Sequence, residues 1–187
     1  MIVAPQTPAD QDQPADQDQA AGELLAGTVI AQLISAGETI AVAESLTGGM
    51  LAAALTSVPG ASAAFRGGVV AYASDLKASL LGVSADLLAR CGAVHPEVAA
   101  EMAAGVSRRL AATAGVATTG VAGPDPADGQ PVGTVFIPVG TVFIAVHLRG
   151  RTTGRALSLT GDRQAIRVAT VNCALTLVSS ALREDKY

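Results

Sequence analysis

The chain contains few aromatic residues and few charges. Its 187 residues include no Trp, three Phe and two Tyr, although half of the chain is hydrophobic. Thirty-eight alanines stand among the hydrophobic residues, so the core must be closely packed from Ala, Val, Leu and Ile. Charged residues make up 15% of the chain, below the usual quarter, which excludes disorder throughout. The length fits one ordinary domain.

Basic residues are scarce, and lysine is the scarcest. Twelve Lys and Arg oppose sixteen Asp and Glu for a net charge of −4, so we expect no direct nucleic-acid partner. Ten of the twelve are Arg, and Lys77 is the only lysine away from the C-terminus. Four of the acids fall in residues 1–19, which hold no base, so the rest of the chain is neutral.

Residues 1–19 are rich in Pro, Gln and Asp, which predicts a disordered acidic tail before a folded domain over 20–187. The tail lacks the basic and apolar regions of a signal peptide. Cys91 and Cys173 have no CxxC partner, and the two histidines are isolated. We therefore expect buried free thiols, no metal centre and a cytoplasmic location.

Residues 129–148 carry no charge and contain a perfect tandem repeat, Pro131–Ile137 followed by Pro138–Ile144. Their Pro, Gly and β-branched residues predict strand and turn, so we expect no membrane partner. The repeat is seven residues long, an odd number, whereas strand side chains alternate with a period of two. If one strand ran through both copies, equivalent side chains would therefore point to opposite faces of the sheet. Pro138 also cannot donate to a central ladder. We predict that the second copy, continuing to Leu148, forms the core strand and the first copy an arm or enlarged loop.

Hydrophobic periodicity predicts strands that alternate with helices along the chain. Such alternation favours a layered α/β/α domain with a mostly parallel or mixed central sheet flanked by helices, and an antiparallel hairpin late in the chain. The helices are expected over 20–36, 46–57, 75–81, 85–90, 96–112 and 162–182, and the strands over 39–43, 67–73, 116–119, 132–147 and 155–159.

Ser45 lies at a predicted junction of strand and helix, in Ala-Glu-Ser-Leu-Thr-Gly-Gly. Open α/β sheets place their sites at this carboxyl edge. The helix start offers unpaired N–H groups, and Gly48 and Gly49 would let a ligand approach the backbone. Alternatively, Ser45 simply caps the helix. A Walker-type phosphate loop is excluded because no Gly-Lys-Ser/Thr follows.

Tyr72 ends a predicted strand and Lys77 lies in the first turns of the next helix. In a chain that otherwise uses Arg, this lysine indicates a need for an amine that can lose its proton. A desolvated Lys can act as the base toward a Ser hydroxyl. The alternative is a surface lysine without a catalytic role.

Two further segments suggest ligand contacts at the same edge. Thr118–Asp125 ends a strand in small residues, which favours either close approach of a ligand or an ordinary Gly/Pro/Asp turn. Asp162 is a natural cap for the last helix. Behind it, Arg163 and Arg167 either present one anion-binding face or are surface arginines.

In this order and spacing, the segments resemble the C-terminal domain of competence/damage-inducible protein CinA, whose stand-alone version is the nicotinamide-mononucleotide amidohydrolase. The resemblance covers roughly residues 22–183. The residues that carry it are Ala43–Gly49, Gly67–Lys77, Gly92–Val94, Glu97–Met102, Thr119–Asp125, the Pro-Val-Gly-Thr-Val sequence and Gly161–Arg163.

The resemblance implies hydrolysis of the carboxamide of nicotinamide mononucleotide to nicotinate mononucleotide and ammonia, without a metal or organic cofactor. It implies that Ser45 is the nucleophile, Lys77 the base, and Tyr72 the partner that relays or orients the proton. Backbone N–H groups around Thr47–Gly49 would then stabilise the oxyanion. The residues expected to bind substrate are Thr47, Gly48, Gly49, Thr119, Gly120, Gly123, Arg163 and Arg167.

Some features depart from the family pattern. Leu46, Ser74 and Thr119 stand where Cys, Asn and Ser are usual, and the tandem repeat is an addition beside the Gly120–Asp125 loop. Two other functions stay open: a non-catalytic competence or DNA-damage accessory that acts through protein partners, and an amidase for a different carboxamide. We expect a small-molecule substrate and a homo-oligomer, because Ala-rich helices with few charges could pack against a second subunit.

Overall fold

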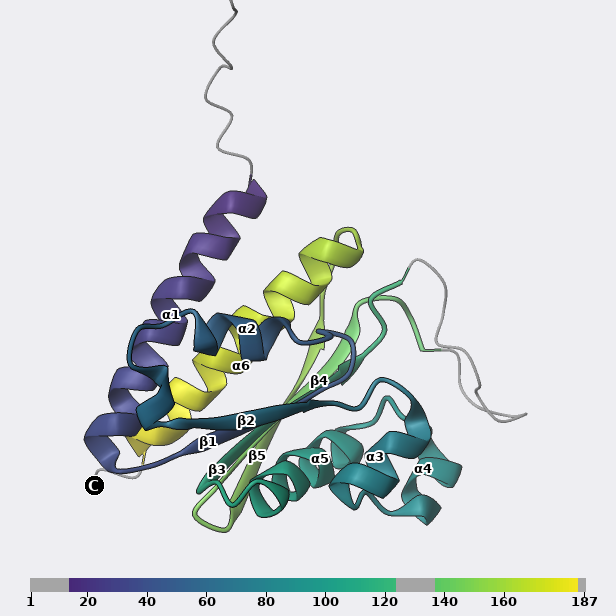
Figure 1. Ribbon diagram of the computed structural model, residues 1–187. Helices are drawn as coiled ribbons and strands as arrows, with labels where there is room; N and C mark the ends of the chain where they lie inside the picture. Colours follow the sequence, from purple (N-terminus) through teal and green to yellow (C-terminus); the bar gives the residue numbers. More distant parts are fainter. Residues whose placement is uncertain (1–13, 124–136, 185–187) are drawn as a thin grey trace, which may run out of the picture.

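The computed structural model describes residues 14–123 and 137–184, which form a layered domain of one sheet between helices (Figure 1). The strands are β1 (Ile40–Glu44), β2 (Phe65–Val70), β3 (Ala114–Gly120), β4 (Thr141–Leu148) and β5 (Arg151–Ser158). The helices are α1 (Pro14–Ala36), α2 (Met50–Thr56), α3 (Ser74–Leu81), α4 (Ala85–Cys91), α5 (Pro96–Arg109) and α6 (Arg163–Glu184), with a 3₁₀ turn, η1, at Ala61–Ala63.

The sheet is mixed, with strand order β2-β1-β3-β4-β5. β1 pairs in parallel with β2 and β3, whereas β3 with β4 and β4 with β5 are antiparallel pairs. The register sets Glu44 beside both Val70 and Thr118, so the carboxyl ends of the three parallel strands meet at one edge. The predicted α/β/α architecture and late hairpin are confirmed.

The two faces of the sheet differ in side-chain size. Helices α1, α2 and α6 pack with Val and Ile residues of the strands, such as Val42 and Val116. Helices α3, α4 and α5 cover the opposite face (Figure 1), where the same strands present Ala43 and Ala117. Alternate strand residues point to opposite faces, so a chain rich in Ala can build one thin layer and one thicker layer.

On the sheet face that presents Ala43 and Ala117, helix α5 packs closely against β3 and α3. A Cβ added at Gly115 of β3 would lie 2.0 Å from the carbonyl oxygen of Ala103. A Cβ at Gly105 of α5 would lie 1.9 Å from the carbonyl oxygen of Leu81, at the end of α3. These two glycines therefore set the spacing of α3, α5 and β3, which holds α3 and its Lys77 against the sheet.

Helix α1 begins at Pro14 rather than at Ala20, so the prediction of a disordered tail to residue 19 was wrong for 14–19. Proline is well tolerated in the first turn of a helix. Packing on α6 extends the helix, because Asn172 Nδ2 donates to the carbonyl oxygen of Asp18 at 2.9 Å. Residues 1–13 lie outside the described residues.

Helix α2 begins at Met50, four residues later than the predicted start at Leu46. Residues 45–49 form a tight turn, with Gly48 at φ +58° and Gly49 at φ +98°. Both values lie in the left-handed region, which glycine adopts at little cost. Ser45 is therefore not the cap of α2, and the capping interpretation of this serine was wrong.

The second copy of the repeat forms the core strand, as predicted. Pro138–Gly140 make a turn, and Thr141–Ile144 continue into β4 between β3 and β5. The buried residues of β4 join both cores. The first copy, apart from Ile137, lies outside the described residues.

Helix α6 is the one described helix that is long and apolar enough to cross a membrane by length and composition. Half of its apolar window is buried inside the domain, where Ile166, Ala174 and Leu175 pack in the core. Core helices share this composition, and α6 also packs along α1. Its hydrophobicity is accounted for by these contacts.

Two mid-helix glycines test how closely α5 is packed. Gly27→Ala, in α1 with nothing within 4 Å of the added Cβ, is expected to raise the free energy of unfolding by about 0.5–1 kcal/mol. Gly105→Ala makes the same change where the added Cβ meets a carbonyl, and is expected to lower it by about 1–3 kcal/mol. Urea unfolding measures both. An equal change in the free energy of unfolding for the two variants would contradict the close packing of α5.

Candidate active site

The loops that follow β1, β2 and β3 bring the predicted catalytic residues to one edge of the sheet. Ser45 directly follows β1, and its N–H donates to the carbonyl oxygen of Thr118 at 3.0 Å. The N–H of Ala71, directly after β2, donates to the carbonyl oxygen of Glu44 at 2.8 Å. These backbone bonds continue the sheet pairing past the strand ends and fix where Ser45 sits.

Lys77 and Ser45 are in hydrogen-bond contact. Lys77 Nζ lies 3.1 Å from Ser45 Oγ, and it donates to the carbonyl oxygen of Ala71 at 2.7 Å and to that of Tyr72 at 3.5 Å. Lys77 is only 1% exposed and Ser45 9%. Helix α3 turns this lysine inward, so the chain's one internal lysine is a buried group and not a surface residue.

Burial lowers the pKa of Lys77 from its ordinary value of 10.5 to about 8, although the nearby Asp75 acts to raise it. Burial has this effect because it disfavours the charged ammonium. No described carboxylate forms an ion pair with Lys77. The amine is therefore uncharged in an appreciable fraction of molecules near neutral pH, which is what a base requires.

Glu44 ends β1 as a fully buried carboxylate. Its Oε2 accepts the N–H groups of Gly49 and Leu51 at 3.0 and 3.1 Å, and its Oε1 accepts that of Ala52 at 2.8 Å. A carboxylate at a helix start satisfies otherwise unpaired donors and matches the helix dipole. Sequence reasoning missed this role, and the signal that could have found it is an acid within an apolar strand.

The two threonines predicted to bind substrate, Thr47 and Thr119, form hydrogen bonds between segments at this edge of the sheet. Thr47 Oγ1 lies 2.8 Å from Thr118 Oγ1, and Thr119 Oγ1 donates to the carbonyl oxygen of Ala93 at 2.8 Å. All three side chains are fully buried. These bonds tie the loop after β1 and the loop before α5 to β3.

The predicted glycines lie at the same edge in different surroundings. Gly48 is exposed, whereas Gly49 and Gly120 are partly buried. Gly123 has φ +74° and is buried, and a Cβ there would meet Val139 at 2.7 Å. Val139 belongs to the second copy of the repeat, so the repeat contacts the loop that closes this side of the site.

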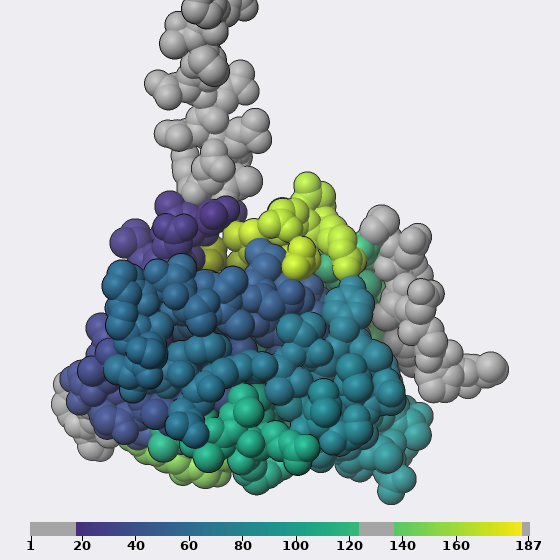
Figure 2. Space-filling view, in the orientation of Figure 1, coloured from purple at the N-terminus to yellow at the C-terminus, as the bar shows by residue number. Residues whose placement is uncertain are grey.

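The first turns of α6 bring two arginines to the three loops. Arg163 donates through Nη1 to the carbonyl oxygen of Gly123 and through Nη2 to the hydroxyl of Tyr72 at 2.7 Å. Arg167 donates to the carbonyl oxygens of Leu46 and Thr47, at 3.0 and 2.8 Å. Figure 2 shows the first turn of α6, in yellow-green, beside the residues that follow β2. Every acceptor named here is uncharged, and no described carboxylate pairs with either guanidinium.

Tyr72 lies on the surface beside this edge of the sheet, with 58% of the residue exposed. Its hydroxyl bonds to Arg163, and among the described residues it has no hydrogen bond to Ser45 or Lys77. The contact of Tyr72 with Lys77 is made by its backbone carbonyl. In this arrangement Tyr72 can orient the amine, and a direct relay through its hydroxyl would require the bond to Arg163 to break.

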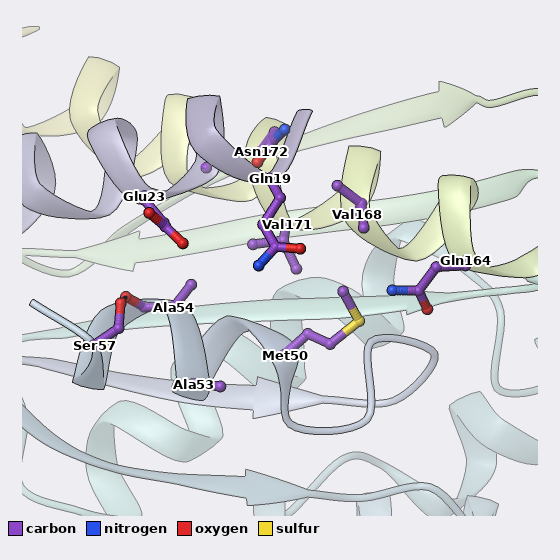
Figure 3. A pocket seen from close by; sticks show the side chains of 11 residues that line it. Gln19, Glu23, Met50, Ala53, Ala54, Ser57, Gln164, Val168, Val171 and Asn172 are labelled. Atoms are coloured by element: carbon purple, nitrogen blue, oxygen red, sulfur yellow. Dashed lines mark hydrogen bonds between the residues drawn. The ribbon is translucent and has the colours of Figure 1, made fainter. Parts of the chain in front are cut away.

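A separate cavity of about 330 Å³ lies between α1, α2 and α6, on the sheet face opposite α3. Figure 3 shows Met50, Val168 and Val171 around it, with Glu23 and Gln164 also lining it. It contains neither Ser45 nor Lys77. Across residues 14–123 and 137–184, no group of three or more His, Cys, Asp or Glu is placed to hold a metal ion.

A family model, the CinA C-terminal domain, matches residues 23–139 and 137–182. The chain belongs to the CinA C-terminal domain family. The two matched segments overlap at 137–139, inside the tandem repeat, which agrees with the expectation that the repeat is an addition to the family pattern. The recognition from sequence is confirmed.

CinA relatives resemble the chain closely but are longer. The CinA-like protein of Frankia casuarinae is 50% identical over 185 residues, covering 97% of this chain and 41% of the relative. The CinA-like protein of Gloeobacter violaceus is 47% identical over 158 residues, covering 80% of this chain and 37% of the relative. The chain thus spans about two fifths of the length of these curated relatives.

Solved structures share the fold over nearly their whole length. The CinA superfamily protein of Klebsiella pneumoniae is 33% identical with a TM-score of 0.80, covering 87% of this chain and 98% of that structure. A competence/damage inducible protein of Agrobacterium tumefaciens is 37% identical with a TM-score of 0.78, covering 87% and 95%.

The lowered pKa of Lys77 predicts how stability depends on pH. Well below pH 8 the lysine is mostly protonated in both the folded and unfolded states, and burial of the charge opposes folding. Between about pH 8 and 10.5 the folded state binds fewer protons than the unfolded state, so stability rises with pH. Compared with Lys77→Met, the free energy of unfolding of the native sequence should gain about 3 kcal/mol across this range.

Urea unfolding of both proteins from pH 7 to 10.5 measures this gain. Other titrating groups contribute to both proteins and largely cancel in the difference. A difference that stays constant with pH would mean that Lys77 has the same pKa in both states.

Proposed function

We propose that the chain is an amidohydrolase that converts nicotinamide mononucleotide to nicotinate mononucleotide and ammonia. The observation that carries the proposal is the buried contact of 3.1 Å between Ser45 Oγ and Lys77 Nζ. A Ser hydroxyl needs a base to become a nucleophile, and a Lys with a pKa near 8 can provide one. The choice of substrate comes from the family resemblance, and the site's chemistry is compatible with it.

The carbonyls around Lys77 favour the role of base. A neutral amine has two N–H groups and one lone pair. The carbonyl oxygens of Ala71 and Tyr72 are placed to accept the two N–H groups, which leaves the lone pair for the Ser45 hydroxyl. Lys77 would therefore receive the Ser45 proton without rearrangement of its surroundings.

Acyl transfer would proceed in two stages. Ser45 Oγ attacks the carboxamide carbon as its proton passes to Lys77, and a tetrahedral oxyanion forms. When the C–N bond breaks, the protonated Lys77 returns a proton to the leaving nitrogen, and ammonia departs. Water then gives a proton to Lys77 and attacks the acyl ester. The ester C–O bond breaks, Lys77 passes that proton to Ser45 Oγ, and the acid product leaves and ionises to the carboxylate.

The first turns of α6 support recognition of a phosphate. Of the two arginines there, Arg163 is the better candidate, because it bonds one carbonyl and one hydroxyl, whereas two carbonyls of the turn after β1 already hold Arg167. Arg163 is the more exposed, so its guanidinium can reach an anionic ligand more readily. A phosphomonoester would match it in charge and hydrogen-bond geometry.

Two other functions remain candidates. Solved relatives carry competence and damage names, and one candidate is a non-catalytic accessory of those processes that acts through protein partners. An amidase for a different carboxamide would use the same pair of residues, Ser45 and Lys77. A cytoplasmic location and a homo-oligomeric state also stay predictions.

Ammonia release distinguishes these functions. The purified chain is incubated with nicotinamide, its riboside and its mononucleotide, and we expect turnover of the mononucleotide above the other two. Ser45→Ala should reduce this turnover by roughly 10⁴–10⁶-fold, as for other lost nucleophiles. Ser57→Ala, the same change at an exposed serine beyond α2, serves as the control and should leave it unchanged.

Each contrary result identifies a different function. Turnover that survives Ser45→Ala contradicts the assignment of the nucleophile. Turnover of another carboxamide alone supports the related amidase, and the absence of any ammonia supports the accessory role.

The pH profile tests the base. With Lys77 as the base, kcat/KM should rise with pH and reach half its maximum near pH 8. Lys77→Arg should be inactive at every pH, because a guanidinium does not lose its proton in this range. Lys186→Arg makes the same change at the only other lysine and should preserve the profile. A native profile that is flat between pH 7 and 9 would contradict the role of Lys77.

A further inference from the structure

The turn that carries Ser45 uses almost all of its backbone N–H groups within the protein. Among residues 45–52, six N–H groups have acceptors: those of Ser45, Gly48, Gly49, Met50, Leu51 and Ala52. Three of these six donate to the Glu44 carboxylate. The N–H groups of Gly48 and Gly49, which the sequence suggested as oxyanion donors, are therefore already engaged.

The N–H groups of Leu46 and Thr47 are the two in this turn with no acceptor among the described residues. Leu46 is 4% exposed and Thr47 is fully buried. A buried donor without a partner costs about 1–3 kcal/mol, so folded proteins rarely leave one unpaired. Two such donors directly after a candidate nucleophile point to an acceptor that arrives with the ligand.

Arg167 fixes the opposite side of these peptide groups. Its Nε donates to the carbonyl oxygen of Leu46 at 3.0 Å, and its Nη2 donates to that of Thr47 at 2.8 Å. In a planar trans peptide the C=O and N–H point in opposite directions. Because Arg167 holds the Leu46 carbonyl, it directs the Thr47 N–H away from α6.

The remaining bonds fix the preceding peptide. The Ser45 carbonyl accepts the N–H of Gly48 at 3.1 Å, which directs the Leu46 N–H away from that bond. The turn is thus held at Glu44 on one side and at Arg167 on the other. Arg167 connects it to α6, some 120 residues further along the chain.

We infer that the Leu46 and Thr47 N–H groups form the oxyanion hole for a tetrahedral adduct on Ser45, and that Arg167 is a positioning residue, which orients the Thr47 N–H. The inference rests on the proposed function. As Ser45 Oγ bonds to the carboxamide carbon, the π electron pair moves onto the carbonyl oxygen and the serine proton moves to Lys77. The Leu46 N–H, adjacent to the nucleophile, is then the nearest donor to the new anion.

This role differs from the phosphate contact suggested for Arg167 by the sequence. A phosphate ligand would have to compete with two backbone carbonyls for this guanidinium. A positioning role predicts loss of transition-state binding, whereas a phosphate contact predicts loss of ground-state binding. The two roles therefore separate in a comparison of a planar ligand with a tetrahedral one.

Pyridine-3-boronic acid provides the tetrahedral ligand. Its trigonal boron accepts an electron pair from Ser45 Oγ, the serine proton passes to Lys77, and the boron becomes a tetrahedral anion visible by ¹¹B NMR. Nicotinate mononucleotide, the expected product, is the planar ligand, and it carries the phosphate. Dissociation constants for both are measured for the full chain and its variants.

Arg167→Met should weaken the boronate adduct by about 10- to 100-fold and leave the affinity for nicotinate mononucleotide within twofold. Arg167→Lys, whose ammonium can still donate to the two carbonyls, should recover part of the loss. Arg183→Met removes an arginine from the other end of α6, where it bonds Ser179 and Ser180, and is the matched control. On turnover, Arg167→Met should lower kcat and leave KM nearly unchanged.

Each contrary result has a distinct meaning. Unchanged boronate affinity in a folded Arg167→Met overturns the inference, and so does an equal loss for both ligands, which would indicate a phosphate contact. If Arg167→Met does not fold, Arg167→Gln carries the same comparison. If the native chain gives no tetrahedral boron signal, or if the signal survives in Ser45→Ala, Ser45 is not the nucleophile and the proposed function fails as well.

Discussion

The structure of the site depends on the burial of Lys77. An ammonium group loses most of its hydration when it is buried, and this loss lowers its pKa to about 8. Three oxygens surround Nζ: two backbone carbonyls and the Ser45 hydroxyl. None of them carries a charge that would hold the proton on the amine. A carboxylate in the same place would have restored the usual pKa and removed the base.

The remainder of the domain shields this lysine from water and fixes its position beside Ser45. Helix α3 carries Lys77, and α5 presses on α3 at Gly105, where no side chain separates the two backbones. The nucleophile belongs to a different element, the turn after β1. Glu44 anchors that turn to α2, and Arg167 anchors it to α6. The reacting pair thus depends on contacts between residues far apart in the chain.

Helix α6 joins the loops of the three parallel strands. Arg167 contacts the loop after β1, and Arg163 contacts Tyr72 after β2 and Gly123 after β3. Val139, from the second copy of the repeat, lies against Gly123. The second copy of the repeat therefore supplies one complete core strand and contacts a loop that Arg163 also holds.

The sequence by itself determined the layered architecture and the second repeat copy as the core strand, and it singled out Lys77, which the family resemblance paired with Ser45. These follow from local patterns: hydrophobic period, the odd length of the repeat, and the rarity of lysine. It misplaced the start of α1, because packing between Asp18 and Asn172 is not visible in local composition. It also missed Glu44, and it took Arg167 and the Gly48 and Gly49 N–H groups as ligand contacts. Only the tertiary structure decided which donors already had partners, since hydrogen bonds between distant segments depend on how those segments pack.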